Sequence, residues 1–135
     1  MFTRGMEFDL GEDVNALRDM VHRWAQERVK PIASEVDRTN TFPNDLWTEM
    51  GELGLLGITV PEEFGGAGMG YLAHTIAVEE IARGWMPVSG IINTHFIVAY
   101  MILQHGTEEQ KQRYLPKMAT GEIRGAFSMS EPALG

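Results

Sequence analysis

Hydrophobic side chains recur every three or four residues along most of the chain, a spacing typical of amphipathic helices. The first such stretch follows Gly11, and its two leading acidic residues suit the positive end of a helix dipole. Pro31 cannot continue an undistorted helix, so we expect the helix to end or kink near Lys30, with a kink or a short second helix there rather than a long loop. The apolar face of the first stretch contains Val14, Leu17, Val21, Trp24 and Ala25.

The next part of the chain alternates between helical and broken patterns. Residues 40–44 interrupt the pattern, and a helix then runs to Gly54, which is placed to stop it in the left-handed conformation. The apolar residues 58–60 precede Pro61, which favours an extended backbone. A glycine-rich loop follows, so the connection to the next helix is expected to be tight.

Three more helices are predicted in the second half of the chain. Residues 71–83 form the first, which Gly84 ends. Residues 87–105 form the second, and because this stretch is apolar nearly all round, we expect it at the centre of the fold. Thr107 and Gln110 have the spacing of a capping box, which opens the last helix.

The chain ends on a different pattern. Residues 124–129 resemble a β-strand, yet no second strand is predicted to pair with it. A lone strand leaves its backbone N–H and C=O groups without partners. The predicted fold class is therefore all-α, a bundle of about five or six helices followed by one strand, and the chain reads as a piece of something longer.

Charge and composition remove several classes of function. The net charge of −8 argues against nucleic acid and against an anionic membrane surface as partners, since both attract clustered Lys and Arg. The absence of cysteine excludes disulfides and thiolate chemistry. The longest apolar run, residues 96–103, is far shorter than the ~20 residues of a membrane span. We expect a soluble, cytoplasmic protein.

Two motifs have a chemical and a structural interpretation. The glycine loop at 65–70 lacks the G-x-G-x-x-G spacing, and no Lys-Ser/Thr follows it, so a connector is favoured over a phosphate site. The four histidines share no metal-ligand spacing, and no metal site is expected. His95 lies inside the apolar helix, where a core histidine with its polar atoms hydrogen-bonded is favoured.

Mostly small residues gather on one face of that helix. Gly90, Asn93, Thr94 and Ile97 follow the three-and-four spacing, with Ser89 alongside. Such a face admits either a closely packed helix or a ligand. The pattern alone favours close packing.

Motifs along the whole chain, in a fixed order, carry a resemblance to a known family. They are 53–58 (LGLLGI), 61–68 (PEEFGGAG), 79–83 (EEIAR), 106–116 (GTEEQKQRYLP) and 125–135 (GAFSMSEPALG). Together they resemble the acyl-CoA dehydrogenases from about residue 8 to the end. The Met-Ser-Glu-Pro form at 129–132 is more similar to the isovaleryl-CoA dehydrogenase branch than to the medium-chain branch, which has Thr-Glu-Pro.

The resemblance implies a domain organisation and an activity. Residues 1–121 would form the family's N-terminal helical domain, and 122–135 the truncated start of its middle β-domain. Family members bind FAD and an acyl-CoA thioester, remove the α-proton with a carboxylate and pass the β-hydride to flavin N5, in fatty acid or branched-chain amino acid catabolism. They are usually homotetramers that pass electrons to electron-transferring flavoprotein. The catalytic Glu belongs to a C-terminal domain, so this chain alone is expected to be inactive.

The resemblance also assigns site residues. Ser130 matches the Ser/Thr that hydrogen-bonds the flavin, where a hydroxyl stabilises charge on the reduced ring. Phe127 and Met129 match its neighbours, which contact the flavin or the thioester. The residues that match the acyl-pocket positions are Ser89, Gly90, Asn93, Thr94 and Ile97. For this face the resemblance favours the ligand interpretation over close packing.

Two other functions are considered beside this one. A helical module without catalysis would bind a partner or self-associate through the exposed apolar faces that the family's other domains would otherwise cover. A relative with the same fold and different flavin chemistry, such as an acyl-CoA oxidase, would share the motifs.

Overall fold

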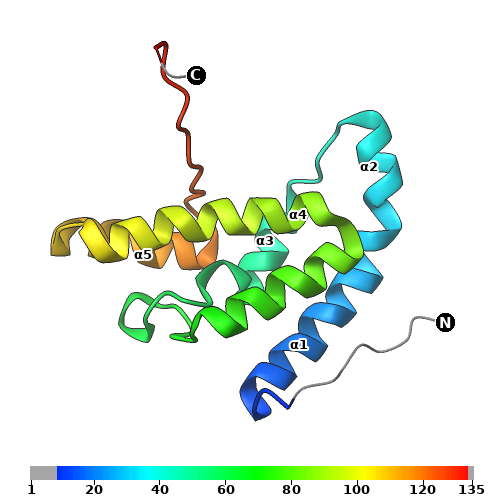
Figure 1. Ribbon diagram of the computed structural model, residues 1–135, viewed down its shortest axis with the longest axis horizontal. Helices are drawn as coiled ribbons and strands as arrows, with labels where there is room; N and C mark the ends of the chain where they lie inside the picture. Colours follow the sequence, from blue (N-terminus) through cyan, green and yellow to red (C-terminus); the bar gives the residue numbers. More distant parts are fainter. Residues whose placement is uncertain (1–8, 134–135) are drawn as a thin grey trace.

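The computed structural model describes residues 9–133 and is built from helices, as predicted (Figure 1). The described residues contain no strand. The elements, in chain order, are α1 (Glu12–Trp24), a π-helix (Ala25–Val29), a 3-10 turn (Lys30–Ile32), α2 (Ala33–Thr39), α3 (Asp45–Glu52), 3-10 turns at Leu55–Gly57 and Glu62–Phe64, α4 (Tyr71–His105) and α5 (Glu108–Thr120).

The N-terminal helical run is continuous but changes its winding twice. Helix α1 passes into the π-helix and then into the 3-10 turn before α2 begins. The 3-10 turn contains Pro31, whose ring and missing N–H disturb regular α-helical hydrogen bonding. Of the two alternatives predicted near Lys30, the structure has the short second helix, α2, which follows the 3-10 turn without a long loop.

Polar contacts fasten this run to α3. Arg28 Nε donates to Glu49 Oε1 at 2.7 Å, and Trp24 Nε1 donates to Glu49 Oε2 at 3.0 Å. The hydrogen bond to Glu49, together with the charge of Asp45, raises the pKa of Arg28, so the guanidinium stays charged. Helix α3 is followed by Gly54 in the left-handed conformation, with φ of 72°, as predicted.

Helix α4 bends back on itself at Trp85, whose φ of −163° and ψ of 110° are not helical. The two halves lie side by side (Figure 1). The ring of Phe96 stacks on the ring of His74, with 4.1 Å between their centroids, and meets the ring of Tyr71 edge-on, with 6.0 Å between centroids. These halves correspond to the two helices predicted at 71–83 and 87–105.

Gly84 allows the bend to approach the π-helix. A Cβ at this position would lie 2.8 Å from the Ala25 carbonyl oxygen and 3.1 Å from Ala25 Cβ. The absence of a side chain at Gly84 therefore permits the close approach of α4 to Ala25.

Two hydrophobic clusters hold the helices together. The first joins the N-terminal run, α3 and α4, and its fully buried members include Val21, Val29, Leu46, Met50, Ile81, Val88 and Ile92. The second joins α4 and α5, and contains Val60, Phe64, Ala99, Leu115, Met118 and Ala119. Because α4 contributes to both clusters, it is the central helix, as predicted.

The described part of the chain has one helix, α4, that is long and apolar enough to cross a membrane. The core helix of a globular protein passes the same test. The bend at Trp85 divides α4, and both halves contribute residues that are buried against other helices. We therefore interpret α4 as a core helix.

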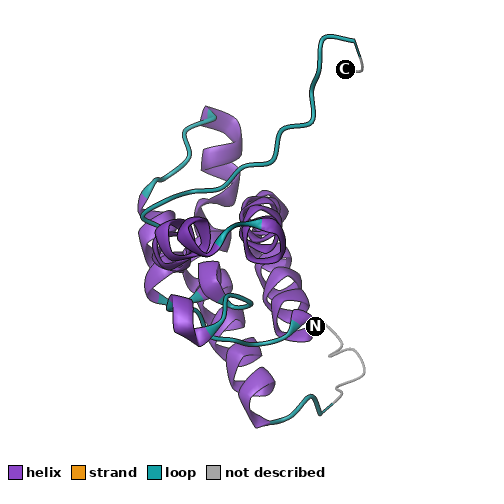
Figure 2. Cartoon of the chain, turned by 90° about the vertical axis from the view of Figure 1, so that its left-hand side faces the viewer, coloured by secondary structure: helices purple, strands orange, loops and turns teal. Residues whose placement is uncertain are grey.

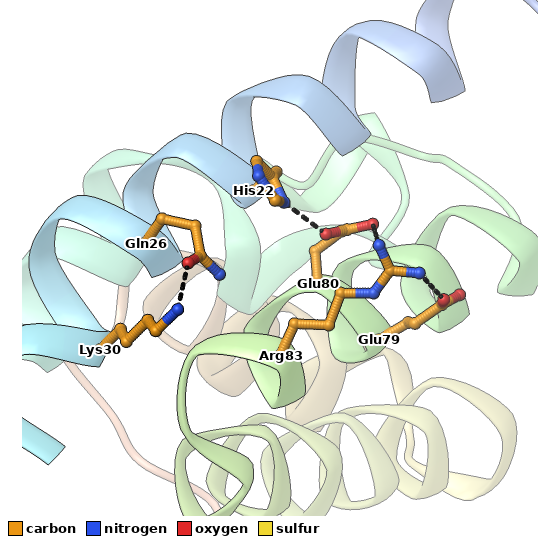
Figure 3. A network of polar contacts seen from close by, with 6 residues as sticks. All are labelled: His22, Gln26, Lys30, Glu79, Glu80 and Arg83. Atoms are coloured by element: carbon orange, nitrogen blue, oxygen red, sulfur yellow. Dashed lines mark hydrogen bonds and ion pairs between the residues drawn. The ribbon is translucent and has the colours of Figure 1, made fainter. Parts of the chain in front are cut away.

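A polar network joins α1 to the first half of α4 (Figure 3). Glu80 is 3% exposed, and its Oε2 lies 2.8 Å from His22 Nδ1. Arg83 approaches Glu80 at 3.4 Å and also donates to the exposed Glu79 at 2.6 Å. The buried carboxylate thus has a partner on each of two helical segments.

Two predictions of extended structure are wrong. Ile58 has helical φ and ψ of −51° and −46°, because turn hydrogen bonds from Gly57 to Gly54 and from Val60 to Gly57 wind this segment. Residues 124–129 form no strand within the part of the chain that the structure describes, since no neighbouring strand offers backbone partners. They leave the bundle as a loop instead (Figures 1 and 2).

Candidate functional site

The second half of α4 has an inner and an outer face. Val88, Ile92, His95 and Ala99 are buried on the inner face, which points into the two hydrophobic clusters. Residues 90, 94 and 97 lie on the opposite side of the helix by its periodicity. They form the centre of the face that the sequence assigns to an acyl group.

The predicted acyl-pocket residues differ in their exposure. Gly90 and Asn93 are exposed, whereas Thr94 and Ile97 are partly buried. A Cβ at Gly90 would have no heavy atom within 4 Å. Ser89 is an exception, because it is buried and its hydroxyl donates to the Met86 carbonyl at 2.6 Å. The face is therefore partly exposed and consists mostly of small side chains, with open space in front of Gly90.

Asn93 borders a buried histidine that the sequence analysis did not single out. His74 is 7% exposed, and its Nε2 is buried without a hydrogen-bond partner. Burial lowers the pKa of His74, and the polar side chain of the neighbouring Asn93 partly offsets that effect. The bend of α4 creates this pair, and a linear pattern gives no sign of it.

His95 is the core histidine that was predicted. It is 1% exposed, and both of its ring nitrogens have partners on the backbone, Met118 in α5 and Gly125 beyond it. Burial lowers the pKa of His95, an effect that the Met118 hydrogen bond partly offsets. The ring is therefore neutral at neutral pH.

The C-terminal segment leaves the bundle next to this histidine. Ile123 donates its amide to the Lys117 carbonyl at 3.0 Å, and the Arg124 guanidinium lies over the ring of Trp47, 4.8 Å from its centroid. From residue 126 to residue 133 every residue is exposed. These contacts hold the start of the segment, and no contact of comparable kind is found beyond it in the described residues.

The three predicted flavin-contact residues lie on the exposed part. Phe127 is 43% exposed, Met129 is 75% exposed, and Ser130 is exposed as well. The segment extends away from the helices (Figures 1 and 2), so the structure does not bring these residues together with the acyl-pocket face. The C-terminal segment does approach α4 at Gly125, whose backbone packs against Val98.

The glycine-rich loop is a connector, as predicted. Its amides at 66, 67, 68 and 69 donate to the carbonyls of residues 61, 57, 60 and 58, respectively. A Cβ at Gly66 would overlap the carbonyl of Val60, so the loop closes tightly on itself. Because these amides are used inside the loop, they do not form an anion-binding cradle. Within residues 9–133, no group of three or more His, Asp or Glu side chains is placed to hold a metal ion.

Known proteins resemble this chain in sequence and in fold. It is 46% identical over 138 residues to the mitochondrial isovaleryl-CoA dehydrogenase of Solanum tuberosum, covering 99% of this chain and 33% of that protein. It matches a glutaryl-coenzyme A dehydrogenase in its glutaryl-CoA complex with a TM-score of 0.89 and 38% identity, over 96% of this chain and 34% of that one.

A second solved structure contains a reduced flavin. The glutaryl-CoA dehydrogenase of Mycobacterium smegmatis in complex with FADH2 matches with a TM-score of 0.85 and 28% identity, over 93% of this chain and 33% of that one. The chain spans about a third of the length of each of these proteins. Residues 11–122 match the family described as acyl-CoA dehydrogenase, N-terminal domain, and the chain therefore belongs to the acyl-CoA dehydrogenase family.

Proposed function

We propose that this chain is the N-terminal portion of a FAD-dependent acyl-CoA dehydrogenase, in which it supplies one wall of the acyl site and the first flavin-contacting segment. The observation that carries the proposal is the family match over residues 11–122, which covers the whole helical bundle. Two of the relatives are named isovaleryl-CoA dehydrogenase and glutaryl-coenzyme A dehydrogenase, and both names specify an acyl-CoA thioester as substrate, which supports the proposal.

The outer face of α4 would contact the acyl chain. Gly90, with open space in front of its Cα, would admit a branched or bulky acyl group, while Thr94 and Ile97 contribute apolar atoms. Asn93 would lie at the edge of this surface beside His74. Ser89 would lie beneath this surface without contacting the acyl chain through its hydroxyl, because the hydroxyl is already bonded to the Met86 carbonyl. Each acyl methylene buried here contributes roughly 0.8 kcal/mol.

The segment after Gly125 would contact the flavin. FAD, when bound, accepts the hydride removed from the substrate β-carbon. The Ser130 hydroxyl would donate a hydrogen bond to the ring, and Phe127 and Met129 would cover it with apolar surface. Their exposure in this chain leaves them free for such contacts.

The remaining expectations concern the complete protein. We propose that it forms a homo-oligomer, passes electrons to an electron-transferring flavoprotein and works in the cytoplasm. The name of the Solanum relative places that protein in mitochondria. Fractionation of cells that express the tagged protein distinguishes these two locations.

The experiment is to compare this chain with a version extended to the length of its relatives. The extended protein is expected to bind FAD, with flavin absorbance, and to reduce an artificial electron acceptor with isovaleryl-CoA or another short acyl-CoA. The 135-residue chain is expected to bind FAD weakly or not at all. An extended protein that neither holds FAD nor reduces the acceptor would refute the proposal. Oxygen consumption separates an acyl-CoA oxidase from a dehydrogenase.

Exposed apolar side chains favour a second function, a helical interaction module without catalysis. Tyr71, Leu72, Met86 and Met129 are each more than half exposed, at 60%, 51%, 71% and 75%. Such surface favours self-association or partner binding. Sedimentation of the pure chain as a compact monomer would argue against this alternative.

A further inference from the structure

His95 connects three parts of the molecule. From the inner face of α4 its Nε2 lies 3.0 Å from the Met118 carbonyl oxygen in α5, and the Gly125 amide donates to Nδ1 at 3.1 Å. A carbonyl oxygen only accepts a hydrogen bond, and an amide N–H only donates one. The ring must therefore carry its single proton on Nε2, which fixes both the tautomer and the orientation of the imidazole.

Gly125 is the last described residue that is not exposed. A Cβ at this position would lie 2.9 Å from Met118 Cε and 2.9 Å from Val98 Cβ, so the backbone itself packs against the helices. The preceding residue is held as well, because the Arg124 guanidinium lies over the ring of Trp47. The Trp47 ring in turn lies 6.1 Å from the His95 ring. The segment is thus crowded against the helices at Gly125, and its backbone hydrogen bond there goes to His95.

We infer that His95 is a positioning residue for flavin binding: it anchors the backbone at Gly125 and so sets the direction in which Phe127, Met129 and Ser130 leave the helical bundle. The inference rests on the proposed function, because it concerns the segment assigned to the flavin. Ser130 follows Gly125 by only five residues, so a change of backbone direction at Gly125 displaces its hydroxyl. A hydrogen bond to the flavin ring requires that hydroxyl to lie within about 0.5 Å of its productive position.

His74 provides a matched control. It lies on the same helix, it is also buried, and burial lowers its pKa too. Its ring stacks on Phe96, and no hydrogen bond or ring contact joins it to the C-terminal segment as far as residue 133. A change at His74 therefore tests the loss of a buried imidazole from α4 without the loss of the Gly125 anchor.

The first experiment uses the 135-residue chain. In ¹⁵N NMR spectra the His95 ring is expected to be protonated on Nε2 and unprotonated on Nδ1; a proton on Nδ1 in the native chain would overturn the inference without any variant. Hydrogen exchange of the Gly125 amide is expected to be roughly fivefold to tenfold faster in His95→Phe. His95→Gln, which keeps a donor and an acceptor, should recover part of the protection, and His74→Phe should leave it unchanged.

The second experiment uses the protein extended to the length of its relatives. FAD is expected to dissociate about tenfold more readily from His95→Phe than from the native protein, with partial recovery in His95→Gln and native behaviour in His74→Phe. Equal FAD affinity in the native protein and in His95→Phe would overturn the inference and leave the proposed function standing. A native protein that holds no FAD would instead overturn the proposed function, whatever the exchange at Gly125.

Discussion

The inner and outer faces of the second half of α4 differ in how completely their side chains are buried and hydrogen-bonded within the chain. On the inner face Val88 and Ile92 are at most 1% exposed, and the one polar side chain, His95, has a partner for each ring nitrogen. On the outer face Gly90 has open space in front of it, and Met101 is 43% exposed. One helix therefore closes a core with one side and presents a surface with the other, and substitutions on the two sides should have different consequences.

The largest expected effect contrasts two isoleucines of this helix. Ile92→Ala removes a fully buried side chain and should lower the free energy of unfolding by about 2–5 kcal/mol. Ile97→Ala, on the outer face, should cost less than about 1 kcal/mol. Urea denaturation followed by circular dichroism measures both. Equal losses would mean that the outer face is as tightly packed as the inner one.

A second contrast makes the same substitution at two glycines of α4. Gly84→Ala pushes a methyl group against the Ala25 carbonyl and should destabilise the chain by about 1–3 kcal/mol. Gly90→Ala meets no neighbour and should stabilise the chain by about 0.5–1 kcal/mol, because alanine favours the helix. Thermal unfolding gives both signs directly. A destabilised Gly90→Ala variant would show that the outer face lacks the space described.

Two adjacent carboxylates extend the comparison to the first half of α4. Glu80→Gln removes a buried charge that pairs with His22 and Arg83, and should cost roughly 1–2 kcal/mol. Glu79→Gln, half exposed, should change stability by less than about 0.5 kcal/mol. Denaturation at low and high salt measures both stability losses. Salt should reduce only the loss in Glu79→Gln, because only the exposed ion pair is well screened. If the two variants lose the same stability, the buried Glu80 in the network of Figure 3 contributes no more to stability than the exposed Glu79.

The smallest expected effect depends on pH. Burial lowers the pKa of His95 and His74 below the usual 6.5, so the unfolded chain takes up these protons at a higher pH than the folded chain. Their contribution to stability is therefore complete above about pH 6.5 and declines as the pH falls through that value toward the folded pKa. Denaturation at about pH 7.5 and about pH 5.5 should show this decline. A variant with both histidines replaced by Phe should show a shallower decline.

Much of the fold follows from patterns that act within one or two helical turns. The apolar spacing locates the helices, Pro31 places the change of winding, and the Thr107 capping box forms with both of its hydrogen bonds. Gly121 ends α5 in the left-handed conformation, with φ of 82°, as glycine commonly does at the end of a helix. These signals are local, so the sequence displays them directly.

The features that escaped prediction depend on contacts between distant residues. Ile58 turns instead of extending because its neighbours are drawn into the core. The burial of His74 arises from the fold-back of α4 on Phe96. The Gly125 hydrogen bond to His95 likewise requires α5 to be in place first. For the site, the sequence predicted which residues share the outer face, while the burial of Ser89 and the separation of that face from residues 127–130 required the coordinates.

The bend at Trp85 has a consequence for the order in which the chain acquires its structure. Because α4 doubles back on itself, the contacts of His74 and Tyr71 with Phe96 join neighbouring stretches of one polypeptide and close only a short loop. Contacts of this kind form quickly, since little chain entropy is lost in making them. We therefore expect this helical hairpin to assemble early in folding and to serve as the template on which the N-terminal run and α5 later dock.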